Sequence, residues 1–189
     1  MGLKWQCVEY ARRWTFVRKG AIFPSVEGAK DMWNQLTYVQ RVVDQKRYAL
    51  KRHENGSPYP PRNESYLIYP QQKDMPYGHV SVIVQVLPRA IRVAEQNFYF
   101  TYWKHHFARE IPVTLRDGRY YIEDQYQVYG WMEIDDSDKH LKPLDQAMID
   151  TIQLKNQQNR ALVSSCRTVL SSDVSLLLLS FFVSHAIFF

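Results

Sequence analysis

Residues 78–97 carry a strand pattern that dominates the middle of the chain, GHVSVIVQVLPRAIRVAEQN. Alternating β-branched residues on both sides of a Pro88-Arg89 turn predict two antiparallel strands, from Val80 to Val86 and from Ile91 to Asn97. The segments YLIY, RYYIEDQY and VYGWMEI show further strand patterns. Because these strands follow helical segments and do not alternate with them, the sequence predicts an α+β fold with an antiparallel sheet.

Two helical segments precede the strands. Between Gln6 and Arg18, apolar or small residues recur at spacings of three and four, which predicts an amphipathic helix of at least three turns. These residues are Cys7, Tyr10, Ala11, Trp14 and Val17, and Glu9, Arg12 and Arg13 are expected on other faces. The segment SVEGAKDMWNQL predicts a second, shorter helix with Ser25 as its cap. The proline-rich stretch from His53 to Ser65 is expected to be a loop.

Composition limits the class of protein. With 189 residues the chain can bury one core of ordinary size without cross-links. Its two cysteines, Cys7 and Cys166, are too few for a disulfide framework and favour free thiols in a reducing compartment. No apolar signal segment follows Met1, so we expect a cytoplasmic protein. The net charge is +5, but the Lys and Arg residues do not form the long basic runs of nucleic-acid-binding tails. No nucleic-acid partner is therefore expected.

The end of the chain differs in composition from the rest. We expect a catalytic domain over residues 1–150 and an atypical tail over 151–189, because composition changes abruptly after DTIQLKNQQNR. Residues 174–189 form the apolar run VSLLLLSFFVSHAIFF, which is shorter than the ~20 residues of a membrane helix. A packed helix, a membrane anchor and an aberrant terminus are therefore all open, and we favour the last.

Cys7 stands at the start of the first predicted helix, where the helix dipole stabilises a thiolate. A nucleophile also needs a base and a group that orients the base. Of the six histidines, His79 opens a strongly predicted strand. If the residue numbers of each pair across the hairpin sum to 176, His79 faces Asn97. Glu95 then lies on the same face as His79, with their Cα atoms about 7–8 Å apart. The same register places Val80, Val82 and Val84 on the core face with Ala90 and Ala94.

Taken singly, each of these residues also has a structural interpretation. Free cysteine is among the most buried residue types, so Cys7 could be a small hydrophobic core residue. His79 could be a structural strand histidine, and Glu95 could lie at a solvated strand end. The residues by themselves leave the catalytic and the structural interpretation equally open.

Several segments of the chain resemble one family. The motifs WQCVEYARRW, NGSP, YGHVSVIVQV, IRVAEQN and YYIEDQY with YGWM resemble the amidase domain of bifunctional glutathionylspermidine synthetase/amidases and of trypanothione synthetases. That domain belongs to the papain-like CHAP group of cysteine, histidine-dependent amidohydrolases and peptidases. The resemblance runs from about Trp5 to Met132. It implies that Cys7 is the nucleophile, His79 the general base and Glu95 the orienting carboxylate.

The resemblance also implies a substrate. Arg12 matches an arginine that holds the glutathione part of a glutathione–polyamine amide, such as glutathionylspermidine or trypanothione. Gln6 is a candidate oxyanion donor beside the Cys7 backbone N–H, and Asn97 is a further candidate contact. No metal and no cofactor is expected. Only Met1 to Gln6 precede the cysteine, where the family has a longer segment, and the ATP-dependent synthetase domain is absent, so we expect no use of ATP or magnesium.

Two other functions remain open from the sequence. Other members of this group cleave peptidoglycan, although this sequence shows neither a secretion signal nor a wall-binding module. The shortened domain could also be an inactive pseudo-amidase that binds glutathione conjugates. The intact set of Cys7, His79 and Glu95 favours activity.

Overall fold

The structure is a computed structural model that describes residues 6–99, 101–159 and 161. The chain divides into two compact units, Met1–Leu144 and Asp145–Phe189. In the second unit, residues 146–159 form a helix. The apolar run and Cys166 lie outside the described residues, so the boundary and nature of the tail stay predictions. In the part of the chain that the structure describes, no helix is long and apolar enough to cross a membrane.

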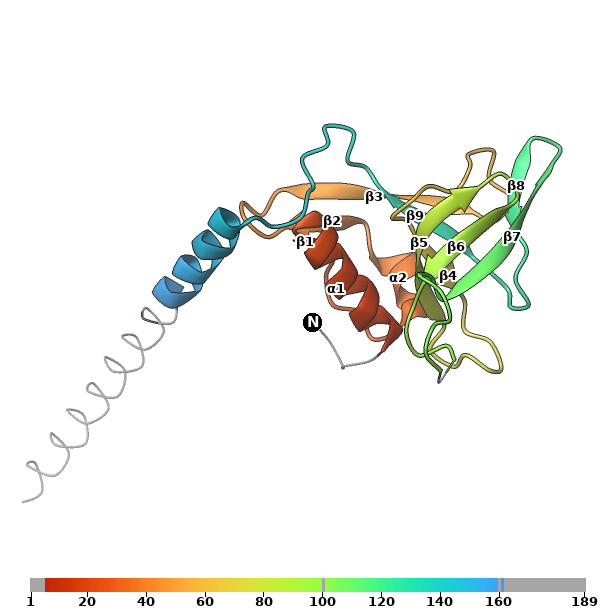
Figure 1. The fold of residues 1–189 in the computed structure, drawn as a ribbon, viewed down its shortest axis with the longest axis horizontal. Coiled ribbons are helices and arrows are strands. Elements are labelled where there is room, and N and C mark those ends of the chain that lie inside the picture. Colours follow the sequence, from red (N-terminus) through yellow and green to blue (C-terminus); the bar gives the residue numbers. More distant parts are fainter. Residues whose placement is uncertain (1–5, 100, 160, 162–189) are drawn as a thin grey trace, which may run out of the picture. The chain divides into compact units, whose positions relative to one another are not determined.

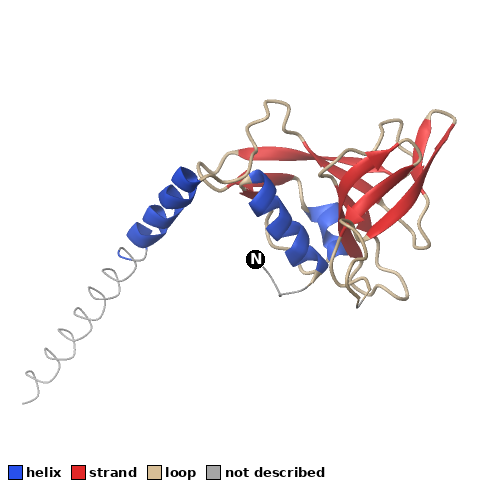
Figure 2. Ribbon diagram, in the orientation of Figure 1, coloured by secondary structure: helices blue, strands red, loops and turns tan. Residues whose placement is uncertain are grey.

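The first unit combines two helices with a nine-stranded sheet in which all paired strands are antiparallel, which confirms the predicted α+β class (Figures 1 and 2). The helices are α1 (Cys7–Lys19) and α2 (Ala29–Gln35). The strands are β1 (Ala21–Ile22), β2 (Tyr38–Arg41), β3 (Arg47–Glu54), β4 (Tyr66–Tyr69), β5 (His79–Leu87), β6 (Ala90–Ala94), β7 (Arg109–Arg116), β8 (Arg119–Ile122) and β9 (Gly130–Ile134). Their order in the sheet is β1-β2-β3-β9-β4-β5-β6-β7-β8, so β9 lies between two strands from earlier in the chain.

Helix α1 confirms the first helical prediction. Gly20 ends it with a φ of 58°, a left-handed conformation that glycine adopts without strain. Glu9, expected on a face other than the apolar one, is buried at 7% exposed, and Arg13 Nε donates to its carboxylate at 3.0 Å. Conversely Val17, expected on the apolar face, is 57% exposed.

The second helix begins later than predicted. Gly28 is the N-cap of α2 in place of Ser25, and the carboxylate of Asp31 accepts a hydrogen bond from the Gly28 N–H at 3.0 Å. Asp31 therefore satisfies a backbone donor at the helix start, the role that the sequence predicts for Ser25. The predicted loop from His53 also begins late, because His53 and Glu54 are the last residues of β3.

The hairpin of β5 and β6 has the predicted register at the end near His79. Val82 pairs with Ala94 and Ile83 with Val93, and both pairs sum to 176. A bulge between Ile83 and Gln85 shifts the remaining pairs by one residue. The predicted alignment of Val84 and Ala90 on the core face is therefore wrong.

Two clusters of buried side chains lie in the first unit. Val80 and Val82 from the start of β5 pack in one cluster with Cys7 and Ala11 from α1. The other cluster joins inward residues of β4, β5, β6 and β9: Leu67, Tyr69, Ile83, Ile91, Val93 and Trp131. Packing of α1 on β5 brings the first residue of the helix to the first residue of the strand, which is where the candidate site forms.

Candidate active site

The thiol of Cys7 lies at the first residue of α1 and is 8% exposed. It interacts with the His79 side chain and with the backbone N–H groups of Val8 and Val80. Backbone N–H groups in the first turn have no partner within the helix, so they are available to a negative charge. The structure thus brings Cys7 and His79 together, as the sequence predicted.

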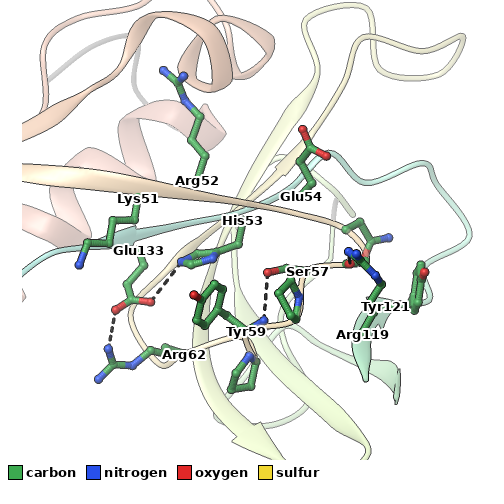
Figure 3. A pocket seen from close by; sticks show the side chains of 14 residues that line it. Lys51, Arg52, His53, Glu54, Ser57, Tyr59, Arg62, Arg119, Tyr121 and Glu133 are labelled. Carbon is green, nitrogen blue, oxygen red and sulfur yellow. Dashed lines mark hydrogen bonds and ion pairs between the residues drawn. The ribbon is translucent and has the colours of Figure 1, made fainter. Parts of the chain in front are cut away.

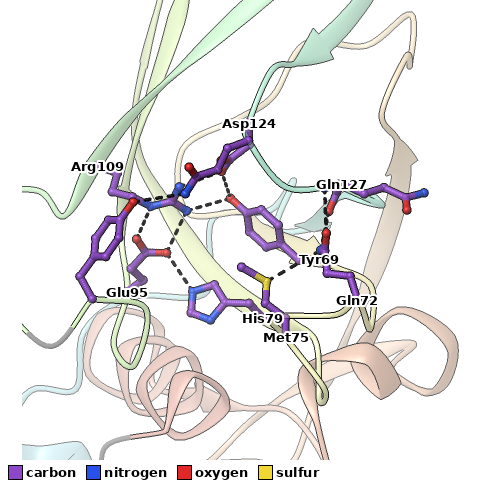
Figure 4. Close-up of polar contacts among 10 residues, drawn as sticks. Tyr69, Gln72, Met75, His79, Glu95, Arg109, Asp124 and Gln127 are labelled. Carbon is purple, nitrogen blue, oxygen red and sulfur yellow. Dashed lines mark hydrogen bonds and ion pairs between the residues drawn. The ribbon is translucent and has the colours of Figure 1, made fainter.

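The His79 imidazole is held on its far side by Glu95. Its Nε2 lies 2.8 Å from Glu95 Oε2, and both side chains are buried (Figure 4). Because Nε2 is engaged, Nδ1 is the nitrogen that remains for the thiol. Gly78 allows this placement: its φ is 68°, and a Cβ there would lie 2.5 Å from the Tyr69 carbonyl oxygen.

Glu95 follows directly after β6 and receives donors on both of its oxygens. Besides His79 on Oε2, Arg109 donates from Nε to Oε1 at 2.6 Å and from Nη2 to Oε2 at 3.2 Å. The carboxylate is 3% exposed. A buried carboxylate with this many donors is fixed in position.

These contacts change the pKa of each member. Burial acts to raise the pKa of the Cys7 thiol, but its hydrogen bond and charge attraction to His79 prevail and lower it. Burial acts to lower the pKa of His79, but Cys7 and Glu95 raise it to about 9. Burial acts to raise the pKa of Glu95, and its bonds to His79 and Arg109 lower it. These directions favour the charged forms, a thiolate and an imidazolium beside a carboxylate.

A pocket of about 540 Å³ opens beside the thiol. Its lining includes Cys7, Gln6, Arg12, Glu27 and Tyr77. Arg12 therefore lines the same pocket as the thiol. Its planar guanidinium suits a carboxylate.

Asn97 does not lie opposite His79, where the predicted hairpin register places it. Strand β6 ends at Ala94, and Asn97 has a φ of 60° in the loop that follows. Its Nδ2 donates to Gln6 Oε1 at 2.8 Å. The two candidate polar contacts, Gln6 and Asn97, are therefore partners of each other, and Gln6 lines the pocket that contains Cys7.

The sequence did not indicate Arg109, which donates to Glu95, or Asp124 and Tyr69, which bond to Arg109 (Figure 4). The only signal was general: a buried carboxylate needs a cation or several donors. Arg109 opens the segment REIPVTLR, but nothing in its neighbours indicates which carboxylate it meets. That pairing depends on the position of β7 beside β6.

A second pocket, of about 960 Å³, lies around the end of β3 (Figure 3). There His53 Nε2 lies 3.5 Å from Glu133 Oε2, and its ring stacks on Trp131 with centroids 5.7 Å apart. No cysteine is among the residues that line this pocket, so it does not repeat the arrangement at Cys7. Among the residues that the structure describes, no cluster of three His, Cys, Asp or Glu is arranged to hold a metal ion.

The CHAP domain family matches residues 1–97. A glutathionylspermidine synthase from Crithidia fasciculata is 32% identical over 138 residues, which are 71% of this chain and 19% of the relative. The bifunctional glutathionylspermidine synthetase/amidase of Escherichia coli K12 is 33% identical, over 70% of this chain and 22% of the relative. A trypanothione synthetase from Crithidia fasciculata is 31% identical, over 65% and 19%.

The chain spans about a fifth of the length of these relatives. The match to the family contains Cys7, His79 and Glu95, the residues that the structure brings into contact. The chain belongs to the CHAP domain family.

Proposed function

We propose that this chain is a cysteine amidase that hydrolyses glutathionylspermidine, or a related glutathione–polyamine amide, to glutathione and the polyamine. The observation that carries the proposal is the continuous contact from Cys7 through His79 to the buried carboxylate of Glu95. One relative with 33% identity is described as a glutathionylspermidine synthetase/amidase, which supports both the reaction and the substrate.

In the proposed first step, the Cys7 thiolate attacks the carbonyl carbon of the amide between the glutathione glycine and the polyamine. The C–N bond breaks, and the His79 imidazolium gives its proton to the leaving nitrogen. The products are a thioester on Cys7, a free amine and a neutral imidazole. Glu95 keeps the ring oriented and stabilises the imidazolium before the transfer.

In the second step, the neutral imidazole of His79 takes a proton from water as the water attacks the thioester. Cleavage of the C–S bond releases glutathione and restores the thiolate–imidazolium pair. The pKa directions of Cys7 and His79 support this cycle, because they favour the charged pair at the start of each turnover.

The oxyanion of each tetrahedral intermediate would be met by the Cys7 backbone N–H and by the Gln6 side chain. The bond from Asn97 Nδ2 to Gln6 Oε1 supports this role, because it occupies the Gln6 oxygen and leaves Gln6 Nε2 as a donor. Asn97 would then act by orienting Gln6. Arg12, in the same pocket, would bind a carboxylate of the glutathione part.

Incubation of the full chain with glutathionylspermidine, with detection of free spermidine, tests the proposal. We expect release by the wild type and by Cys166→Ser, and none by Cys7→Ala. Parallel incubation with purified peptidoglycan tests the rival substrate. Clearing of peptidoglycan without spermidine release would overturn the substrate, and inertness towards both would support a binding-only role.

A further inference from the structure

We propose that Arg109 is a positioning residue for the proposed reaction: it clamps Glu95 so that one carboxylate oxygen faces His79, and Tyr69 and Asp124 hold Arg109 in that orientation. This inference rests on the proposed function and concerns a strand that follows the end of the family model's match at residue 97.

The contact between the Arg109 guanidinium and the Glu95 carboxylate is bidentate. Nε donates to Oε1 at 2.6 Å, and Nη2 donates to Oε2 at 3.2 Å. Such a planar fork fixes the rotation of the carboxylate as well as its position. Oε2 then also lies 2.8 Å from His79 Nε2, so the clamp determines which oxygen meets the imidazole.

The guanidinium is itself anchored on its other side (Figure 4). Nη1 donates to Asp124 Oδ2 at 2.8 Å, and Nη2 donates to the Tyr69 hydroxyl at 3.0 Å. The Tyr69 hydroxyl donates to the same Asp124 oxygen at 2.7 Å. The Arg109 guanidinium carbon also lies 3.7 Å from the centroid of the Phe98 ring, whose other neighbours include His79 at 5.1 Å between centroids.

Burial makes this cation necessary. The side chains of Glu95 and Asp124 are 3% and 4% exposed, and that of Arg109 is 12% exposed. Two carboxylates this close and this buried repel each other unless a cation lies between them. Burial acts to lower the pKa of Arg109, but its bond to Glu95 and nearby charges raise it, so the cation persists across the working pH range. Burial raises the pKa of Tyr69 well above its usual value, so its hydroxyl remains a donor.

Arg109 affects the Cys7 thiol indirectly, through Glu95 and then His79. Without Arg109, the pKa of Glu95 rises, because it loses the cation and keeps Asp124 as a neighbour. A protonated or rotated Glu95 no longer stabilises the His79 imidazolium, and the Cys7 thiolate loses its counter-charge. Besides Cys7, His79, Glu95 and Arg109 themselves, the titratable groups that interact electrostatically with them include Tyr10, Tyr69 and Asp124.

The test uses the full chain in a Cys166→Ser background, so that Cys7 is the only thiol. The measurement is the pH dependence of Cys7 alkylation by iodoacetamide without substrate, together with kcat and KM for glutathionylspermidine. Arg109→Lys keeps the charge and removes the fork. Arg116→Lys is the matched control, because Arg116 lies on the same strand in an exposed ion pair with Glu123.

For Arg109→Lys we expect the alkylation midpoint to rise by about one pH unit, because lysine keeps the charge but cannot hold both oxygens of Glu95, so the carboxylate can rotate away from His79. We expect kcat to fall on the order of tenfold or more with little change in KM, because the misplaced groups act on the transition state. Arg116→Lys should match the wild type. A folded Arg109→Lys with the wild-type midpoint and kcat would overturn the inference.

Tyr69→Phe provides a second variant if Arg109→Lys does not fold. It removes one acceptor of Arg109 and one donor to Asp124 while keeping the buried ring, and it should shift the midpoint in the same direction by less. An unchanged midpoint in Tyr69→Phe would then overturn the inference. Failure of the substrate proposal is distinguishable: the wild type would release no spermidine, yet the shift in Cys7 alkylation would remain.

Discussion

His79 Nε2 and Glu95 Oε2 lie 2.8 Å apart between side chains that are 5% and 3% exposed. A bond this short and this buried fixes the plane of the imidazole and leaves its Nδ1 for the thiol of Cys7. It also couples the three protonation states, since a charge on any member changes the pKa of its neighbours.

Glu95→Gln should lower kcat on the order of 10²-fold with little change in KM, because glutamine keeps the size of the side chain but cannot stabilise an imidazolium. Spermidine release measured over a range of substrate concentrations checks this. Glu110→Gln, which alters an exposed ion pair with Arg92, is the matched control and should be neutral. A neutral Glu95→Gln together with a damaging Asn97→Ala would instead make Asn97 the orienting residue.

Alkylation by iodoacetamide should be faster at Cys7 than at Cys166 at neutral pH and should abolish hydrolysis. The pKa of Cys7 is lowered, so its reactive thiolate forms as pH rises through a value below that of an ordinary thiol. Hydrolysis should then decline as pH rises through about 9, where His79 loses the proton that the leaving amine needs. Equal labelling of the two cysteines with retained activity would exclude Cys7 as the nucleophile.

Arg12→Ala should raise KM for glutathionylspermidine about tenfold or more, which corresponds to ~1.4 kcal/mol of binding free energy. The expected loss is that of a charge-assisted hydrogen bond to a substrate carboxylate. Arg18→Ala is the control on the same helix, because Arg18 is exposed and paired with Glu64. If both variants raise KM equally, general charge attraction and not a specific contact explains the effect.

Deletion of residues 164–189 should improve solubility and leave hydrolysis unchanged, because the first unit ends at Leu144 and the apolar run would otherwise expose a patch prone to aggregation. Thermal unfolding and sedimentation of the shortened chain check this. Loss of folding, or loss of membrane association in cells, would show that the tail has a structural or anchoring role.

Much of the fold near the site could be predicted because it depends on local patterns. The three- and four-residue spacing placed Cys7 at the start of a helix, and the alternation of β-branched residues gave the register that brings His79 towards Glu95. The bulge between Ile83 and Gln85 could not be predicted, because each residue there is equally compatible with a regular strand.

Contacts between distant segments could not be predicted from the sequence, for a different reason. The position of β9 between β3 and β4, and of Arg109 against Glu95, depends on pairings between distant segments that no local pattern specifies. The helical spacing places Glu9 away from the apolar face of α1 and does not predict its burial. In the structure Arg13 neutralises it and in turn donates to Gln96 at 2.9 Å.

Mass spectrometry of the wild type and of Cys7→Ala, mixed rapidly with glutathionylspermidine and quenched in acid, tests the central role of Cys7 most directly. We predict a glutathionyl acyl group on the peptide that contains Cys7, removed by hydroxylamine, and no spermidine release by Cys7→Ala. Spermidine release by folded Cys7→Ala at the wild-type rate would contradict it.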